Sequence, residues 1–194
     1  MPRVLILYAT HHGQTRTVAM AIAQHLRTRG HVVELGDVRD WQRLPPPEDF
    51  DAVVLGSRVE VGRHAPELLA YITSRRAALC RVPTAFFSVS MAAAKPDAGP
   101  DPEGYLARTF TQLGWHPVLA TAFAGGLPYR SYNWFIRLVM KQIARSKGAP
   151  TDTSQNHELT DWSAVTAFAD KVAYIAGGPV AVAPPAPPRQ PQQN

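Results

Sequence analysis

A short polar segment near the N-terminus carries the residues best suited to chemistry. Thr10, Gly13 and Thr15 form the pattern T-x-x-G-x-T directly after an apolar run at positions 4–8. A turn between a buried strand and a helix offers free backbone N–H groups and the positive end of a helix dipole, which together bind phosphate. Glycine allows a close backbone approach, and threonine hydroxyls can donate hydrogen bonds. The phosphate site expected here is formed by Thr10, His11, His12, Gly13, Gln14 and Thr15.

Two motifs that are missing from this segment narrow the choice of ligand. It contains neither a P-loop with its lysine nor the G-x-G-x-x-G dinucleotide fingerprint. Amides and hydroxyls without a lysine suit a single terminal phosphate that is bound without a metal ion. An ordinary strand-to-helix turn, with Thr15 near the N-cap, is the alternative that the motif leaves open.

The elements that must position this segment alternate between strand and helix patterns. The apolar run at 4–8 is continuous, as in a strand that is buried on both faces. Alternation of this kind predicts a doubly wound, five-stranded parallel α/β sheet with helices on both faces. The expected strands are 4–8, 31–35, 51–56, 83–89 and 116–123, and the expected helices are 14–29, 65–79, 103–113 and 162–175.

A sheet of this type binds its ligand at the carboxyl ends of the strands, near the switch in strand order. The loops at 56–62 and 88–92 are therefore expected to flank a flat ring beside the phosphate segment. Serine hydroxyls and backbone amides in these loops can hydrogen-bond the polar edge of such a ring. Simple capping of turns is the alternative role for the serines. The expected ring contacts are Ser57, Arg58, Val59, Ser88, Val89, Ser90 and Met91, with Gly125 and Gly126 after the fifth strand.

Composition limits the class of protein. Lys and Arg total 20 against 15 Asp and Glu, and the net charge of +5 favours anionic partners. The single cysteine, Cys80, excludes an internal disulfide and fits a reducing compartment, where we expect a structural thiol. No apolar run reaches the roughly 18 residues of a membrane span, and the N-terminus does not read as a signal peptide. We expect one domain at 1–177, a disordered proline-rich tail at 178–194, no metal site and no nucleic-acid partner.

An insertion of more than thirty residues, at about 125–160, separates the fifth strand from the closing helix. Arg137, Lys141 and Arg145 recur every four residues opposite a broad apolar arc, which predicts a basic amphipathic helix. A helix packed on its own domain, with a solvated basic stripe, is the alternative. The width of the arc favours a membrane or partner surface. Substrate or membrane contacts are expected from Tyr129, Arg130, Tyr132, Trp134, Arg137 and Lys141.

From position 4 to 175 the chain resembles the flavodoxin-type, quinone-dependent protoporphyrinogen IX dehydrogenases of bacterial haem synthesis. The phosphate motif T-x-x-G-Q-T at 10–15 is common to flavodoxins. More specific are S-V-x-x-x-A-x-K-P at 88–96 and G-x-L-x-Y-x-x-Y-x-W-x-x-R-x-x-x-K at 125–141. Two departures stand out. His11 and His12 occupy positions where an Arg-Asp pair is common, and the loop at 56–62 is only loosely similar.

This resemblance implies a flavodoxin-like fold that binds FMN. It implies oxidation of protoporphyrinogen IX to protoporphyrin IX, with electrons passing to a membrane quinone, either menaquinone or ubiquinone. The protein is then expected on the cytoplasmic face of the bacterial inner membrane as a peripheral enzyme, and a homo-oligomer is compatible with this role. Arg130, Arg137 and Lys141 are expected to hold the anionic substrate. No catalytic side chain is expected, because the flavin supplies the redox chemistry.

Three other classes stay open at this stage. A flavin-dependent NAD(P)H:quinone reductase is the nearest of them, and consumption of nicotinamide would distinguish it. A soluble flavodoxin electron carrier shares the phosphate motif, but such carriers are typically acidic, whereas this chain has a pI of about 9.7. A flavodoxin-like membrane module without a flavin is the third.

Overall fold

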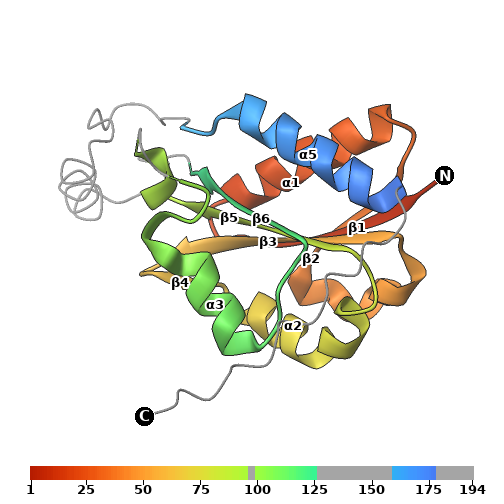
Figure 1. Cartoon of the computed structure of the whole chain (residues 1–194), viewed down its shortest axis with the longest axis horizontal. Coiled ribbons are helices and arrows are strands. Elements are labelled where there is room, and N and C mark those ends of the chain that lie inside the picture. The colour runs from red at the N-terminus through yellow and green to blue at the C-terminus, as the bar shows by residue number, and fades with distance from the viewer. Residues whose placement is uncertain (96–98, 126–158, 178–194) are drawn as a thin grey trace, which may run out of the picture.

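A parallel sheet forms the centre of the fold in the computed structural model, which describes residues 1–95, 99–125 and 159–177 (Figure 1). The order of its strands is β2-β1-β3-β5-β6, so the chain builds outward from β1 in one direction and then in the other. This order confirms the doubly wound sheet predicted from the sequence. The strands are β1 (Arg3–Ala9), β2 (Val32–Asp37), β3 (Ala52–Glu60), β5 (Thr84–Ser90) and β6 (Leu119–Ala124), with a short β4 (Arg63–His64) antiparallel to β3.

In the described part of the chain, four α-helices cover the two faces of the sheet (Figure 1). On one face lie α1 (Gln14–Thr28) and α5 (Trp162–Gly177), and on the other lie α2 (Pro66–Leu79) and α3 (Tyr105–Leu113). The Asp170 carboxylate of α5 joins the first pair, at 2.6 Å from His25 Nε2 and 2.8 Å from a guanidinium nitrogen of Arg29. Short 3-10 turns occupy Val38–Arg43, Pro47–Asp49, Ala92–Ala94 and Pro102–Gly104.

The side chains of β1 explain why its sequence is apolar throughout. Val4 and Ile6 are fully buried in the core formed with α1 and α5. Leu5 and Leu7 are buried in the opposite core, with α2 and α3. Complete burial of one such side chain stabilises the fold by about 2 kcal/mol. A strand that contributes to two cores therefore carries no polar face.

The register of the sheet brings the carboxyl ends of its strands to one edge. Ala9 of β1 lies opposite Ser57 of β3, which in turn lies opposite Ser88 of β5. Further across, Ser90 of β5 lies opposite Ala124 of β6. The segments that follow these strands consequently emerge side by side at this edge.

The third strand is longer than its sequence pattern predicts. A loop was expected from position 56 onward, but β3 continues to Glu60. It then turns into β4 through Val61 and Gly62, whose φ angles are 49° and 73°. Two consecutive positive φ angles are typical of a tight hairpin turn. Along β3 the side chains are buried as far as Ser57, half-buried at Arg58 and Val59 and exposed at Glu60, so the end of the strand needs no apolar run. We call residues 57–64 the hairpin.

The start of the fifth predicted strand was also misplaced. His116 is exposed and precedes β6, which begins at Leu119. Its ring packs edge-on against Phe110 of α3, with ring centroids 6.0 Å apart.

Cys80 lies at the end of α2, as expected, and its thiol is free and exposed.

Gly56 leaves the space that the buried ring of Phe87 fills. A Cβ atom at position 56 would overlap the ring of Phe87, which is fully buried and has no room to withdraw. We expect Gly56→Ala to lower the free energy of unfolding by about 1–3 kcal/mol, as overpacking does in other cores. Urea denaturation measures this. The matched control is Gly99→Ala, where an added Cβ meets nothing within 4 Å. Equal stability of the two variants would contradict this packing.

Candidate functional site

The phosphate segment forms the turn between β1 and α1. Gly13 is the N-cap of α1, with φ 91° and ψ −18°, a conformation that favours glycine. Its N–H donates a hydrogen bond to the Thr10 hydroxyl over 3.0 Å, and its carbonyl accepts one from the Thr17 N–H. A Cβ at Gly13 would meet nothing within 4 Å. The backbone is therefore bent sharply and is open on its outer side.

The N-terminus of α1 is suited to an anion. Among the described residues, no side chain caps this end, and its first turn contains no acidic residue. The first N–H groups of a helix lack partners within the helix, and they lie at the positive end of its dipole. The residues present therefore fit a phosphate group at this position.

Gln14 joins the phosphate segment to the far edge of the sheet. Its side-chain amide donates to the Thr160 hydroxyl over 2.9 Å, and that hydroxyl donates to the carbonyl of Ala124 over 2.8 Å. Ala124 ends β6, and Thr160 lies just before α5. The chain thus leaves the sheet and returns to it beside the phosphate segment. Gln14 and Thr160 both belong to motifs that were recognised in the sequence. The contact between them could not be predicted, because residues so far apart in the chain produce no periodic pattern.

The serines at the carboxyl ends of β3 and β5 hydrogen-bond the backbone. The hydroxyl of Ser57, which is completely buried, donates to the Arg58 carbonyl and accepts from the Ala65 N–H. Ser90 accepts from the Ala93 N–H over 3.3 Å. These bonds match the capping role that the sequence left as an alternative. Contacts with a ring stay predictions for Ser57, Arg58, Val59, Ser88, Val89, Ser90, Met91 and Gly125.

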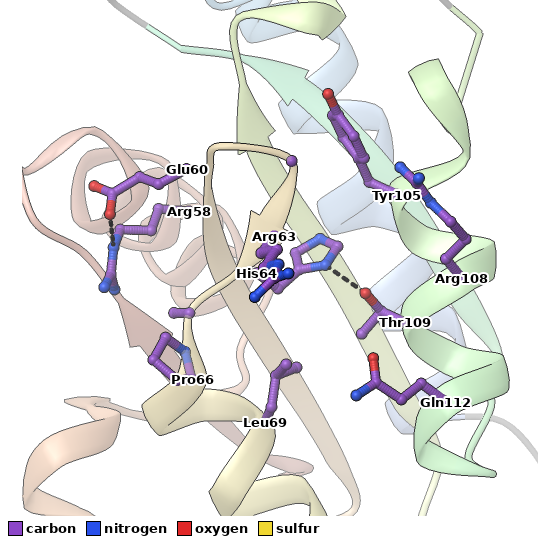
Figure 2. A pocket seen from close by; sticks show the side chains of 12 residues that line it. Arg58, Glu60, Arg63, His64, Pro66, Leu69, Tyr105, Arg108, Thr109 and Gln112 are labelled. Carbon is purple, nitrogen blue, oxygen red and sulfur yellow. Dashed lines mark hydrogen bonds and ion pairs between the residues drawn. The ribbon is translucent and has the colours of Figure 1, made fainter.

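The guanidinium of Arg58 is held between two carboxylates. Its Nε is 3.2 Å from Glu60 Oε2 (Figure 2). One terminal nitrogen is 2.5 Å from Glu67 Oε1. Glu67 lies in the first turn of α2, so this ion pair fastens the hairpin to that helix. The observed role of Arg58 is therefore to hold the hairpin against α2.

Both histidines of the phosphate segment are exposed, and their rings stack at a centroid distance of 4.6 Å. His11 Nδ1 lies 3.4 Å from Glu60 Oε1, which connects the segment to the hairpin. Ligand atoms of His11, His12 and Glu60 all lie within 4.8 Å of one another. Two imidazoles and a carboxylate are donors that zinc accepts. The sequence, from which no metal site was expected, does not reveal this cluster because Glu60 lies far along the chain.

A cavity of about 640 Å³ opens between the hairpin, the start of α2 and the side of α3 that faces the hairpin (Figure 2). No pattern in the sequence predicts this cavity. His64 forms part of its wall and is only 3% exposed. The Nδ1 atom of His64 is 2.8 Å from the Thr109 hydroxyl, and its Nε2 has no hydrogen-bond partner among the described residues. Burial lowers the pKa of His64 to about 4, so the ring is neutral at pH 7.

Several expected site residues lie outside the described residues. They are Gly126, Tyr129, Arg130, Tyr132, Trp134, Arg137 and Lys141, and the expected tail at 178–194 also lies outside. Within residues 1–95, 99–125 and 159–177, no helix has the length and apolar character to cross a membrane.

The fold and this site define a flavodoxin-type domain. The sequence model of the flavodoxin domain family matches residues 5–154, and the chain belongs to this family. Its fold is similar to that of oxidised flavodoxin 1 from Bacillus cereus, with a TM-score of 0.52 and 17% sequence identity over 88% of this chain and 96% of that one. Membership of the family implies a flavin cofactor, and the open, uncapped start of α1 fits its phosphate group.

Two curated relatives make the assignment narrower. The chain is 30% identical over 178 residues to a protein of Escherichia coli K12 named protoporphyrinogen IX dehydrogenase [quinone], covering 91% of this chain and 98% of that protein. It is 34% identical over 188 residues to a protein of the same name from Leishmania major, covering 94% and 78% respectively. The chain therefore belongs to the protoporphyrinogen IX dehydrogenase (quinone) family, which confirms the resemblance seen in the motifs.

The Thr160 hydroxyl offers a test of the link across the sheet edge. Thr160→Val removes both the acceptor for Gln14 and the donor to Ala124. We expect the free energy of unfolding to fall by about 1–3 kcal/mol, because the hydrogen bonds to Gln14 and to the Ala124 carbonyl are lost at a site that is only 8% exposed. Flavin affinity should fall several-fold, since Gln14 belongs to the phosphate segment. Urea denaturation and a flavin titration measure the two effects.

The control for this experiment is Thr166→Val in α5, the helix that follows Thr160. Thr166 is exposed, and its hydroxyl bonds only the Trp162 carbonyl one turn back. Its replacement should change stability by less than about 0.5 kcal/mol. If Thr160→Val proves as stable as the control and binds flavin as tightly as the unchanged protein, the link has no role.

Burial of neutral His64 predicts how stability depends on pH. The folded pKa of about 4 lies below the ordinary value of 6.5, so the unfolded chain binds the proton more readily. The stability that neutral His64 contributes to the folded protein is fully present above pH 6.5. It is lost as the pH falls from 6.5 toward 4, and it changes no further below pH 4. The total loss is roughly 3 kcal/mol.

Urea unfolding of the protein and of His64→Asn at about pH 7.5 and about pH 4.5 measures this loss. Asparagine retains a hydrogen-bonding side chain but does not titrate. The unchanged protein should lose more stability than the variant, by roughly 3 kcal/mol. If both proteins lost the same amount of stability between the two pH values, His64 would have to be charged in the folded protein at the lower pH, which would contradict this prediction.

Proposed function

We propose that this protein catalyses the FMN-dependent oxidation of protoporphyrinogen IX to protoporphyrin IX and passes the electrons to a membrane quinone. The observation that carries the proposal is the match to a dehydrogenase of that name over 91% of this chain and 98% of the relative. The flavodoxin family model, which matches residues 5–154, includes the phosphate segment. The flavodoxin domain supports a flavin, and a loop of hydroxyls and amides at one helix N-terminus supports the monophosphate form.

The residues around the start of α1 bind and orient the cofactor. The backbone N–H groups in the first turn of α1 would receive the phosphate, while the Thr10 hydroxyl fixes the turn by accepting a hydrogen bond from the Gly13 N–H. When bound, FMN supplies two-electron redox chemistry that no amino-acid side chain provides. The hairpin and the segment 88–91 follow β3 and β5, which are neighbours in the sheet, and this supports the expectation that they flank the flavin ring.

Contact with a membrane surface forms part of the proposal. Protoporphyrinogen IX and a quinone both partition toward lipid, so an enzyme that joins them benefits from lying at the bilayer. Support comes from the net charge of +5 and from the aromatic and basic pattern at 129–141. The proposed location is the cytoplasmic face of the inner membrane, with peripheral attachment.

An anaerobic assay of the purified protein tests this function. We expect a yellow protein that forms fluorescent porphyrin from protoporphyrinogen IX only when a quinone is supplied. Menaquinone in anionic vesicles should support a faster reaction than the same quinone in neutral vesicles, because the basic protein concentrates at the anionic surface.

Protein heated before the assay is the control for uncatalysed oxidation. A yellow protein that leaves protoporphyrinogen IX unchanged but oxidises NADH or NADPH with a quinone would overturn the proposal in favour of a quinone reductase. Equal rates in the two kinds of vesicle would overturn the membrane contact alone.

A further inference from the structure

The cavity beside α3 is distinct from the phosphate segment. Its walls come from Gly62, Arg63 and His64 of the hairpin and from Tyr105, Arg108 and Thr109 of α3 (Figure 2). None of the residues 10–15 or 88–91 lines it. Its volume of about 640 Å³ lies within the usual range for small-molecule sites. The cavity is thus large enough to hold part of an organic ligand.

Two guanidinium groups line this cavity without a carboxylate partner in the described part of the chain. Arg63 is exposed, and its guanidinium forms no hydrogen bond or ion pair with another described residue. Arg108 donates only to the carbonyls of Glu103 and Gly104, and its guanidinium lies 5.2 Å from the Tyr105 ring centroid. Arg58 differs from both, because Glu60 and Glu67 neutralise it.

The remaining wall suits a flat, partly apolar ligand. Pro66 and Leu69 of α2 contribute apolar surface, and Tyr105 contributes an aromatic ring. His64 is buried and holds the hairpin against α3 through Thr109. Because Arg63 is the preceding residue in the chain, this contact also holds the backbone of Arg63 beside α3.

The cavity also lies next to the site proposed for the flavin. Glu60 lines the cavity, and the same side chain contacts His11 of the phosphate segment. A ligand seated in the cavity would therefore border the hairpin that flanks the ring. This position suits a substrate rather than a second cofactor.

We propose that this cavity binds the carboxylate-bearing edge of the tetrapyrrole substrate, with Arg63 and Arg108 pairing with its propionates. Guanidinium groups bind carboxylates through two parallel hydrogen bonds, which a lone ammonium cannot match. The inference rests on the proposed function and adds the location at which the substrate is held. It assigns substrate binding to described residues in addition to those expected at 129–141.

Binding of protoporphyrin IX to the flavin-loaded protein tests the proposal. The dimethyl ester of the same porphyrin is the matched ligand, because it keeps the ring and lacks the negative charges. We expect Arg63→Leu and Arg108→Leu each to weaken binding of the diacid by about tenfold, as loss of a charge-assisted pair does. The ester should bind weakly and equally to all proteins. Fluorescence titration in a detergent-containing buffer measures these affinities.

Arg81→Leu is the control variant. Arg81 is exposed in the turn before β5, at the opposite edge of the sheet, so it carries the same charge change away from the cavity. It should bind both ligands as the unchanged protein does. Flavin content and the urea midpoint verify that each variant is folded. Equal binding of diacid and ester, or equal effects of Arg63→Leu and Arg81→Leu, would overturn the proposal.

The experiments distinguish failure of the proposed function from failure of the cavity assignment. If the protein does not oxidise protoporphyrinogen IX but Arg63→Leu still weakens diacid binding, the proposed function is wrong and the cavity remains a carboxylate site. If oxidation proceeds while both cavity variants bind the diacid normally, only the cavity assignment is wrong.

Discussion

The turn at Gly13 can exist only because β1 is fixed on both sides. Parallel neighbours flank this strand, and its side chains fill a core on each face, so its carboxyl end cannot shift without disturbing both cores. A helix that starts directly after such a strand has its first N–H groups held at a defined place. The switch in strand order at β1 opens space beside that place, which is why sheets of this type bind ligands there.

The hairpin extends the same edge and connects its parts. Through Glu60 it contacts the phosphate segment, through Arg58 it is fastened to α2, and through His64 it packs against α3. Each contact involves a polar side chain beyond the end of the apolar strand pattern. The hairpin thereby joins the flavin site to the cavity beside α3, and its rigidity decides how the two are spaced.

The sequence was sufficient to predict the sheet, its helices and the place of the phosphate segment. Continuous apolar runs and helical stripes are local patterns, and the position of Gly13 between such patterns points to a turn at the strand end. The hairpin was missed because the continuous apolar run ends at Gly56 and a second glycine follows at Gly62, a pattern that is typical of a loop, while the short alternation of Arg58 and Glu60 with valines gives only a weak strand signal. The cavity and the bond between Gln14 and Thr160 depend on contacts between distant positions, which no local pattern encodes.

The most direct test of this account compares the affinity of the protein, stripped of flavin, for FMN and for riboflavin, which lacks the phosphate. Charge-assisted hydrogen bonds from the start of α1 should make FMN bind at least about 100-fold more tightly. Fluorescence quenching of each flavin during titration measures the ratio. Equal affinity for the two flavins would contradict the claim that Gly13 and the α1 N-terminus form a phosphate site.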